Sequence, residues 1–91
     1  MQTDAIKTKW ATGATTLGAW ITMREPVTAE VAASAGFDYV CVDMQHGLSD
    51  LRDAAAALQA TMGGTAIPIV RVPWNEPGII GRSLDLSLIH I

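Results

Sequence analysis

Apolar and polar positions along this chain repeat three times in the same order, a short apolar run followed by a helical pattern. The apolar runs are 16–22, 37–43 and 67–72. The first is rich in β-branched and aromatic residues, which favour strands. The second is apolar without alternation through Val40, Cys41 and Val42, which is typical of a parallel strand covered on both faces. Pro73 ends the third run, because proline cannot continue a strand ladder. The pattern therefore predicts three strands.

The segment between the first two runs has the pattern of a helix. Pro26 begins it, since proline is tolerated in a first turn whose amides have no partner within the helix. Gly36 is suited to the C-cap. The positions expected to form the apolar face are Val27, Val31 and Ala35. A shorter pattern over 4–11, which ends at Gly13, predicts one more helix before the first strand.

Two further helices are predicted after the second and third strands. Ser49 is the expected N-cap of the first of them, and Gly63 and Gly64 end it. Its apolar positions are Leu51, Leu58 and Met62. Asn75 is the expected cap of the last helix, whose inner side we expect to carry Ile79, Ile80 and Leu84.

Three consecutive strand-helix units predict a parallel sheet of the α/β class, because each helix brings the next strand back in the same direction. The strands begin near residues 16, 37 and 67. A (β/α)8 barrel uses about 30 residues per unit, which fits this spacing, and a flavodoxin-like sheet fits it equally well. No glycine-rich G-x-G-x-x-G loop follows the first strand, which disfavours a dinucleotide-binding fold.

Composition narrows the class of protein. A chain of 91 residues makes one small domain at most. With 49% apolar residues, 16% charged residues and a mean hydropathy of +0.28, it is more apolar than a self-contained domain of this size should be. The surplus indicates missing partners, either further parts of the same protein or another subunit.

Charge and hydropathy exclude several functions. The net charge of −3 offers no basic surface to a phosphate backbone, so we expect no nucleic-acid partner. The N-terminus has no apolar leader segment and no run reaches about eighteen apolar residues, so we expect a cytoplasmic protein with no membrane partner. The lone Cys41 cannot build a disulfide framework and is expected to be a small buried hydrophobe.

Polar groups gather where the predicted strands end. Because parallel strands share one carboxyl-end rim, five side chains should converge there: Trp20, Asp43, Gln45, His46 and Arg71. Arg71 is costly in an apolar strand unless an anion or a carboxylate compensates it. His46 can move a proton or ligate a metal, or can be structural. Asp43 can ligate a metal, orient a side chain or cap the following loop. Trp20 either fills the core or forms a pocket wall.

Four segments in this order, GAWIT, VDMQHG, IVRVP and RSLDL, resemble the HpcH/HpaI aldolase family of metal-dependent class II pyruvate aldolases, and the resemblance covers residues 14–85. It implies the first three units of a (β/α)8 TIM barrel that reversibly cleaves a 4-hydroxy-2-oxo acid to pyruvate and an aldehyde. It further implies a homo-oligomeric full-length enzyme whose partners are these small molecules.

The resemblance also implies roles for individual residues. His46 corresponds to the general base, and Arg71 to the arginine that binds substrate and stabilises the enolate, an oxyanion that a preoriented cation stabilises strongly. Asp85 corresponds to the acid that makes the histidine more basic, since a carboxylate favours the imidazolium. Trp20 is expected at the substrate. Behind these groups lie Asp43 and Gln45, and Gln45 stands where several relatives carry Glu.

The family's cofactor is a divalent metal, Mg, Mn or Co, held by a Glu and an Asp that the resemblance places beyond Ile91. We therefore expect no metal ligand in this chain and no cation bound to it alone. A noncatalytic α/β module that binds an anionic ligand or partner through Arg71 remains the alternative.

The resemblance also divides the chain in two. We expect residues 1–85 to be the N-terminal part of the barrel. The last six residues, 86–91, depart from the family's usual continuation and match a frame translation of a sequencing adapter. We therefore expect His90 to have no role.

Overall fold

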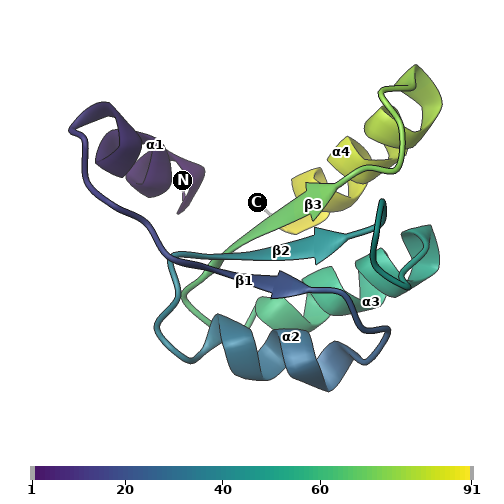
Figure 1. Cartoon of the computed structure of the whole chain (residues 1–91), viewed down its shortest axis with the longest axis horizontal. Helices are drawn as coiled ribbons and strands as arrows, with labels where there is room; N and C mark the ends of the chain where they lie inside the picture. Colours follow the sequence, from purple (N-terminus) through teal and green to yellow (C-terminus); the bar gives the residue numbers. More distant parts are fainter. Residues whose placement is uncertain (1, 91) are drawn as a thin grey trace.

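A computed structural model of the protein describes residues 2–90, with side chains from residue 5 to residue 86. Three strands, β1 (Gly18–Ile21), β2 (Tyr39–Asp43) and β3 (Ile67–Arg71), form a parallel sheet in the order β1-β2-β3. The helices are α1 (Gln2–Ala11), α2 (Pro26–Ala33), α3 (Leu51–Thr61) and α4 (Pro77–His90) (Figure 1). The three predicted strand-helix units and the short helix before them are confirmed.

Predictions for the last residues of the chain fall outside this description. Ile91 lies outside the described residues, and so does the side chain of His90. The expectation that residues 86–91 are foreign to the family therefore stays a prediction. The same holds for the expectation that the metal ligands follow Ile91.

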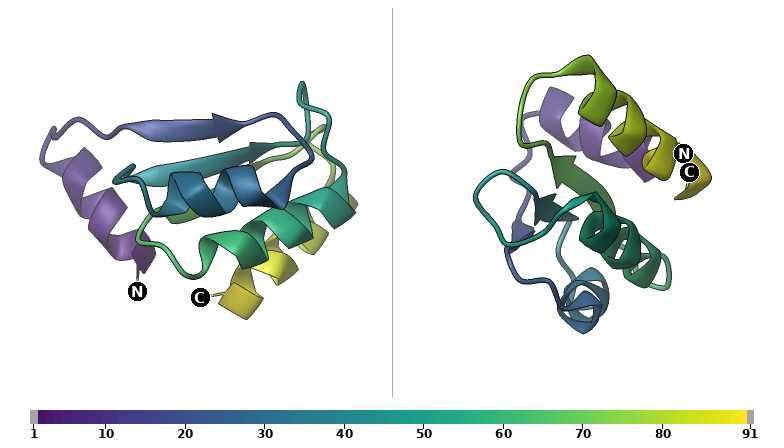
Figure 2. Two further views of the ribbon diagram at one scale, coloured as in Figure 1. Left: turned by 90° about the horizontal axis from the view of Figure 1, so that it is seen from below. Right: turned by 90° about the vertical axis from the view of Figure 1, so that its right-hand side faces the viewer.

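Three helices cover one face of the sheet. Figure 2 shows α2, α3 and α4 side by side on the same face, as expected when the two crossovers through α2 and α3 are both right-handed and α4 follows in the same direction. Side chains of alternate strand positions, including Ile21, Val40 and Val42, pack there against alanines of α2 and α3. Because successive strand residues point to opposite faces, Trp20, Cys41, Asp43 and Arg71 belong to the other face. The register places Asp43 directly beside Arg71.

The buried face of α2 differs from the prediction. Val27 and Val31 are exposed, and the helix buries Ala29 and Ala33 instead. The carbonyl oxygen of Ala33 accepts hydrogen bonds from the two backbone amides that lead into β3, those of residues 65 and 66. Such close backbone contact leaves room only for small side chains, so the larger valines face outward. Met62 and Leu84, expected on inner faces of α3 and α4, are exposed as well.

Two predicted helix caps are also wrong by one residue. Asp50, not Ser49, caps α3 in a reciprocal capping box with Asp53. Ser49 is buried in the preceding loop. Glu76, not Asn75, caps α4, where its carboxylate accepts hydrogen bonds from the backbone amides of residues 78 and 79. Carboxylates can satisfy two amides at once and interact favourably with the helix dipole, which explains both changes.

Gly64 is expected to allow the close packing of α2 against the turn before β3. A Cβ atom at this position would lie 2.4 Å from the carbonyl oxygen of Ala33, whereas at Gly63 it would meet nothing within 4 Å. Gly64→Ala should therefore lower the free energy of unfolding by about 1–3 kcal/mol, because backbone atoms cannot rotate away. Gly63→Ala, the matched control, should change it by less than about 0.5 kcal/mol. Urea unfolding followed by circular dichroism compares the two, and equal midpoints would contradict the packing described.

Candidate active site

The carboxylate of Asp43 is the centre of the polar group at the carboxyl ends of the strands. Asp43 is only 2% exposed, at the end of β2. Its Oδ1 accepts hydrogen bonds from the backbone amides of Gln45 (2.8 Å) and His46 (3.1 Å). Its Oδ2 accepts one from the indole Nε1 of Trp20 at 3.0 Å. Both oxygens are thus engaged, so Asp43 caps the following loop and orients a side chain at the same time.

Arg71 completes this group from the neighbouring strand. Its Nη1 lies 3.6 Å from Oδ2 of Asp43, and its guanidinium carbon lies 5.9 Å from the centre of the Trp20 ring. A cation at this distance from an indole is attracted by the ring. The Arg71 side chain is 40% exposed and Trp20 is 50% exposed. The buried carboxylate of Asp43 therefore holds the side chains of Arg71 and Trp20, while both side chains remain accessible to a ligand.

Asp43 is ionised at any physiological pH. Burial on its own favours the neutral acid, but hydrogen bonds from the indole and from the two backbone amides, helped by the nearby guanidinium, outweigh it and lower the pKa of Asp43 to about 2. A lowered pKa in the folded state means that the carboxylate stabilises the fold above about pH 4. This contribution is lost as the pH falls towards 2.

The loop that carries His46 is pinned to the ends of all three strands. The amide of Met44 donates to the carbonyl of Arg71 at 3.0 Å, and the amide of Leu48 donates to the carbonyl of Thr22 at 2.9 Å. Gly47 lies against backbone, since a Cβ atom there would be 2.4 Å from the carbonyl oxygen of Asp43. The backbone position of His46 is therefore fixed, while its side chain is exposed. No role was predicted for Gly47 from the sequence, although a glycine directly after the histidine was the available signal.

Asp85 stands apart from this group. It follows Pro77 by eight residues on α4, which is about 12 Å along a helix axis. Figure 1 shows α4 running back from the carboxyl ends of the strands, so this displacement leads away from the rim. Asp85 is exposed, and among the side chains described, 5–86, it forms no hydrogen bond or ion pair with His46. Gln45 is exposed too and joins the site through its backbone amide. The roles predicted for these two side chains stay predictions.

Helix N-termini at this rim are already occupied by carboxylates of the chain itself. Glu25 accepts from the amide of residue 27 at the start of α2, and Asp50 and Glu76 cap α3 and α4. An anionic ligand would therefore find these helix ends filled. Arg71 is different, because its guanidinium carries five N–H donors and one nitrogen alone approaches Asp43. The geometry favours Arg71 as the anion contact.

The described residues do not form a metal site. No group of three or more His, Cys, Asp or Glu side chains within this part of the chain is arranged to hold an ion. Asp43 is the buried carboxylate of the rim, and its oxygens are taken by N–H donors with a cation beside them. A metal would have to displace these donors and tolerate the guanidinium. Asp43 is therefore suited to holding Arg71 and Trp20, and not to ligating a cation.

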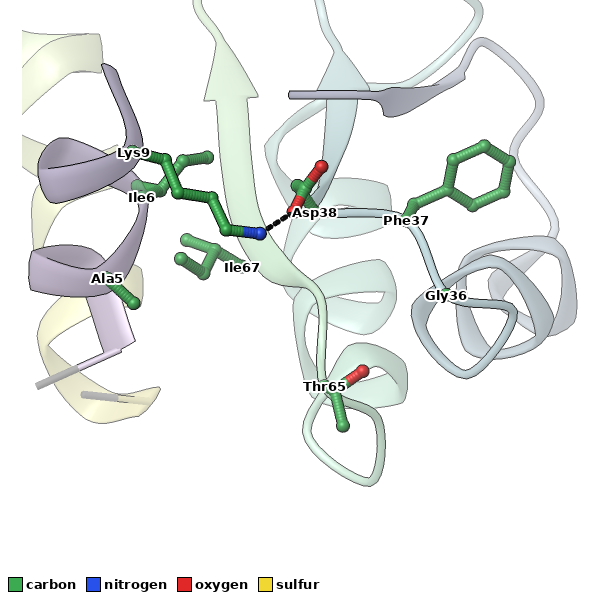
Figure 3. A pocket seen from close by; sticks show the side chains of 8 residues that line it. All are labelled: Ala5, Ile6, Lys9, Gly36, Phe37, Asp38, Thr65 and Ile67. Atoms are coloured by element: carbon green, nitrogen blue, oxygen red, sulfur yellow. Dashed lines mark hydrogen bonds and ion pairs between the residues drawn. The ribbon is translucent and has the colours of Figure 1, made fainter. Parts of the chain in front are cut away.

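A cavity of about 260 Å³ lies at the other end of the sheet, between α1 and the amino ends of β2 and β3. Figure 3 shows Lys9 of α1 reaching across it to form an ion pair with Asp38. Asp38 also accepts a hydrogen bond from the amide of Leu17, and its pKa is lowered, first by the bond from Lys9. In barrels, this end serves stability and the opposite end serves catalysis. The cavity therefore does not compete with the Asp43 group as the active site.

Cys41 is confirmed as a buried residue in the layer beneath Asp43. It is 2% exposed, and burial, followed by the negative charge of Asp43, raises the pKa of its thiol to about 11. A thiol that stays protonated at neutral pH is a poor nucleophile.

No helix within residues 2–90 has both the length and the apolarity needed to cross a membrane.

Comparison with known proteins places these features in a family. The model of the HpcH/HpaI aldolase/citrate lyase family matches residues 16–90. The 5-keto-4-deoxy-D-glucarate aldolase of Salmonella arizonae is 41% identical over 71 residues, which are 78% of this chain and 28% of that enzyme. The chain thus spans less than a third of the length of this curated relative.

Solved structures show the same relationship. A crystal structure of a HpcH/HpaI aldolase/citrate lyase family protein from Burkholderia cenocepacia superposes with a TM-score of 0.81 at 36% identity, over 90% of this chain and 33% of that one. The citrate synthase SbnG superposes with a TM-score of 0.77 at 28% identity, over 90% of this chain and 34% of its own. The three strand-helix units therefore correspond to part of the TIM-barrel-like fold of these proteins, which settles the choice that spacing left open against the flavodoxin-like sheet.

Proposed function

Because this chain belongs to the HpcH/HpaI aldolase/citrate lyase family, we propose that it supplies the first third of a class II pyruvate aldolase, a carbon-carbon lyase that cleaves 4-hydroxy-2-oxo acids. The observation that carries the proposal is the group formed by Trp20, Asp43 and Arg71. It presents a fixed, accessible guanidinium beside an aromatic wall at the end of the sheet where such folds carry out chemistry. The chain's identity to an aldolase of Salmonella arizonae supports the same reaction class.

The name of that relative's substrate fits the proposed chemistry. A 5-keto-4-deoxyglucarate, numbered from its other carboxyl group, is a 2-oxo acid with a methylene at C3 and a hydroxyl at C4. Cleavage between C3 and C4 requires removal of the hydroxyl proton, after which the bonding electrons pass to the 2-oxo group as an enolate. The products are pyruvate, once the enolate is protonated at C3, and an aldehyde acid. We propose this compound as a test substrate.

Each step then has a residue of this chain assigned to it. His46, on the pinned loop, removes the proton from the 4-hydroxyl group and becomes an imidazolium. Arg71 lies beside the 2-oxo group and stabilises the negative charge that develops on its oxygen, which is worth most in a site that excludes water. Trp20 forms one wall against the substrate carbons. Its ring is held in place by its bond to Asp43.

A divalent metal, Mg, Mn or Co, remains part of the proposal. In the family such a cation polarises the 2-oxo acid, and the resemblance places its Glu and Asp ligands beyond Ile91. The roles assigned to His46 and Arg71 concern proton transfer and charge stabilisation by the chain itself.

The proposal is tested with a barrel chimera, in which residues 1–85 of this chain replace the matching region of the Salmonella arizonae aldolase. We expect the chimera to release pyruvate from 5-keto-4-deoxy-D-glucarate and to lose this activity in a chelator, with recovery on adding Mg²⁺, Mn²⁺ or Co²⁺. Pyruvate release coupled to lactate dehydrogenase measures it. A folded chimera without activity would contradict the proposed function, and activity that survives the chelator would contradict the metal dependence.

Activity and binding measurements on the isolated 91-residue chain distinguish this proposal from the alternative of a noncatalytic anion-binding module. As an aldolase part it should neither cleave the substrate nor bind pyruvate strongly, because most of the barrel is missing. Micromolar binding of pyruvate by the isolated chain, lost on Arg71→Ala, would favour the module.

A further inference from the structure

The two oxygens of Asp43 serve different partners, and this division suggests more than a cap. Oδ1 takes the two backbone amides of the loop, at residues 45 and 46. Oδ2 takes the indole of Trp20 and faces the guanidinium of Arg71. One rigid, buried carboxylate thus connects the loop of the proposed base to the two side chains proposed to contact the substrate.

A loop cap alone would not need the second set of contacts. Asparagine or serine can accept hydrogen bonds from backbone amides at such a position, and neither side chain is charged. The Oδ2 contacts instead hold two long side chains that are half exposed, Trp20 at 50% and Arg71 at 40% of its side chain. Left without a partner, both would sample several rotamers. Their shared attachment to Asp43 selects one arrangement, with the guanidinium near the indole ring.

We propose that Asp43 is a positioning residue which, through its two oxygens, fixes the Arg71 guanidinium and the Trp20 indole relative to the His46 loop, so that all three meet a 2-oxo acid in a preset geometry. This inference rests on the proposed function and adds to it a cause of preorganisation. It also predicts an unusual kinetic signature. A negative charge 3.6 Å from Arg71 weakens the attraction of the guanidinium for an anionic substrate while it improves the alignment.

The test is Asp43→Asn in the barrel chimera. The amide oxygen of asparagine can still accept both loop amides, so the loop keeps its cap. The amide NH₂ group, however, meets the indole N–H and the guanidinium donor to donor. We expect kcat to fall about 10- to 100-fold, while KM for 5-keto-4-deoxy-D-glucarate stays unchanged or decreases, because a negative charge next to the cation is gone.

Two further variants distinguish positioning from folding. Trp20→Phe keeps an aromatic ring but is smaller and lacks the N–H donor. Because this variant and Asp43→Asn both remove the hydrogen bond between Trp20 and Asp43, their losses of kcat should be less than multiplicative in the double variant. Asp38→Asn is the matched control, since Asp38 lies just before the same strand but at its amino end, paired with Lys9. It should leave kcat and KM within about twofold of the parent.

An activity-independent measurement separates the failure of this inference from failure of the proposed function. The indole N–H signal of Trp20, assigned by its disappearance in Trp20→Phe, should be protected from solvent exchange in the parent chimera and lose that protection in Asp43→Asn. Protection that persists in Asp43→Asn would overturn the inference, as would a rise in KM with unchanged kcat. Loss of protection in a folded but inactive chimera would uphold the positioning geometry and reject the aldolase function.

Discussion

Replacing His46 by alanine in the barrel chimera is expected to lower kcat/KM by about 10²- to 10⁴-fold, the usual contribution of a general base. The loop around His46 is held by backbone bonds that do not involve the imidazole, including those to Asp43 and Thr22. Because the histidine side chain is exposed, its removal should leave the fold intact. The loss should therefore appear in catalysis with little change in the urea midpoint. Steady-state pyruvate release over a range of pH measures it.

The same pH profile tests Asp85. If this carboxylate acts on His46 through a water molecule, it favours the imidazolium and delays the appearance of the neutral base as the pH rises. Asp85→Asn should then move the acidic limb of kcat/KM to lower pH. Asp43 cannot produce this limb, because its pKa is about 2. In His46→Ala the limb should disappear altogether.

Two results would count against these assignments. A profile for Asp85→Asn that coincides with that of the parent would show that the carboxylate is a solvated helix charge, which agrees with its exposure and with the absence of a direct bond to His46 among the side chains described. A His46→Ala variant with nearly full activity would remove the histidine from the mechanism and leave the base unidentified.

The features that could be predicted from the sequence are those that depend on topology. The unbroken apolar run of Val40, Cys41 and Val42 required a strand covered on both faces, and all three side chains are buried. Parallel strands necessarily share a carboxyl-end rim, so side chains at the ends of three separate strands had to be neighbours. The contact of Trp20, Asp43 and Arg71 is the outcome.

The features that could not be predicted depend on distances between backbones. The valines of α2 gave the stronger apolar pattern, yet Ala29 and Ala33 are buried, because α2 approaches the turn before β3 too closely for larger side chains. The caps at Asp50 and Glu76 depend on where each chain segment leaves its loop, which propensity locates only to within a residue or two. The indole bond of Trp20 needed a strand register that no pattern in the sequence specifies.

Gly47→Ala is expected to lower kcat of the barrel chimera by about 10²-fold, although the glycine has no side chain to contribute. A Cβ atom at Gly47 would lie 2.4 Å from the carbonyl oxygen of Asp43 and 3.1 Å from the Cα atom of Thr22. Both are backbone atoms in or next to strands, so the loop itself must move. The bond from the amide of Leu48 to Thr22 then breaks or lengthens, and the neighbouring amide of His46 shifts relative to Asp43.

The size of this effect follows from geometry. A displacement of a catalytic group by about 1 Å can cost 10²-fold in rate, and overpacking of this kind lowers the free energy of unfolding by about 1–3 kcal/mol. Gly63→Ala is again the matched control, because a Cβ atom there meets nothing within 4 Å, and it should leave both quantities nearly unchanged. Measurements of kcat and of urea unfolding for Gly47→Ala and Gly63→Ala, made side by side, show whether the position of this loop limits catalysis. If Gly47→Ala kept kcat within about twofold of the parent, the position of this loop would not limit catalysis, and the preset geometry proposed for His46 would have to be abandoned.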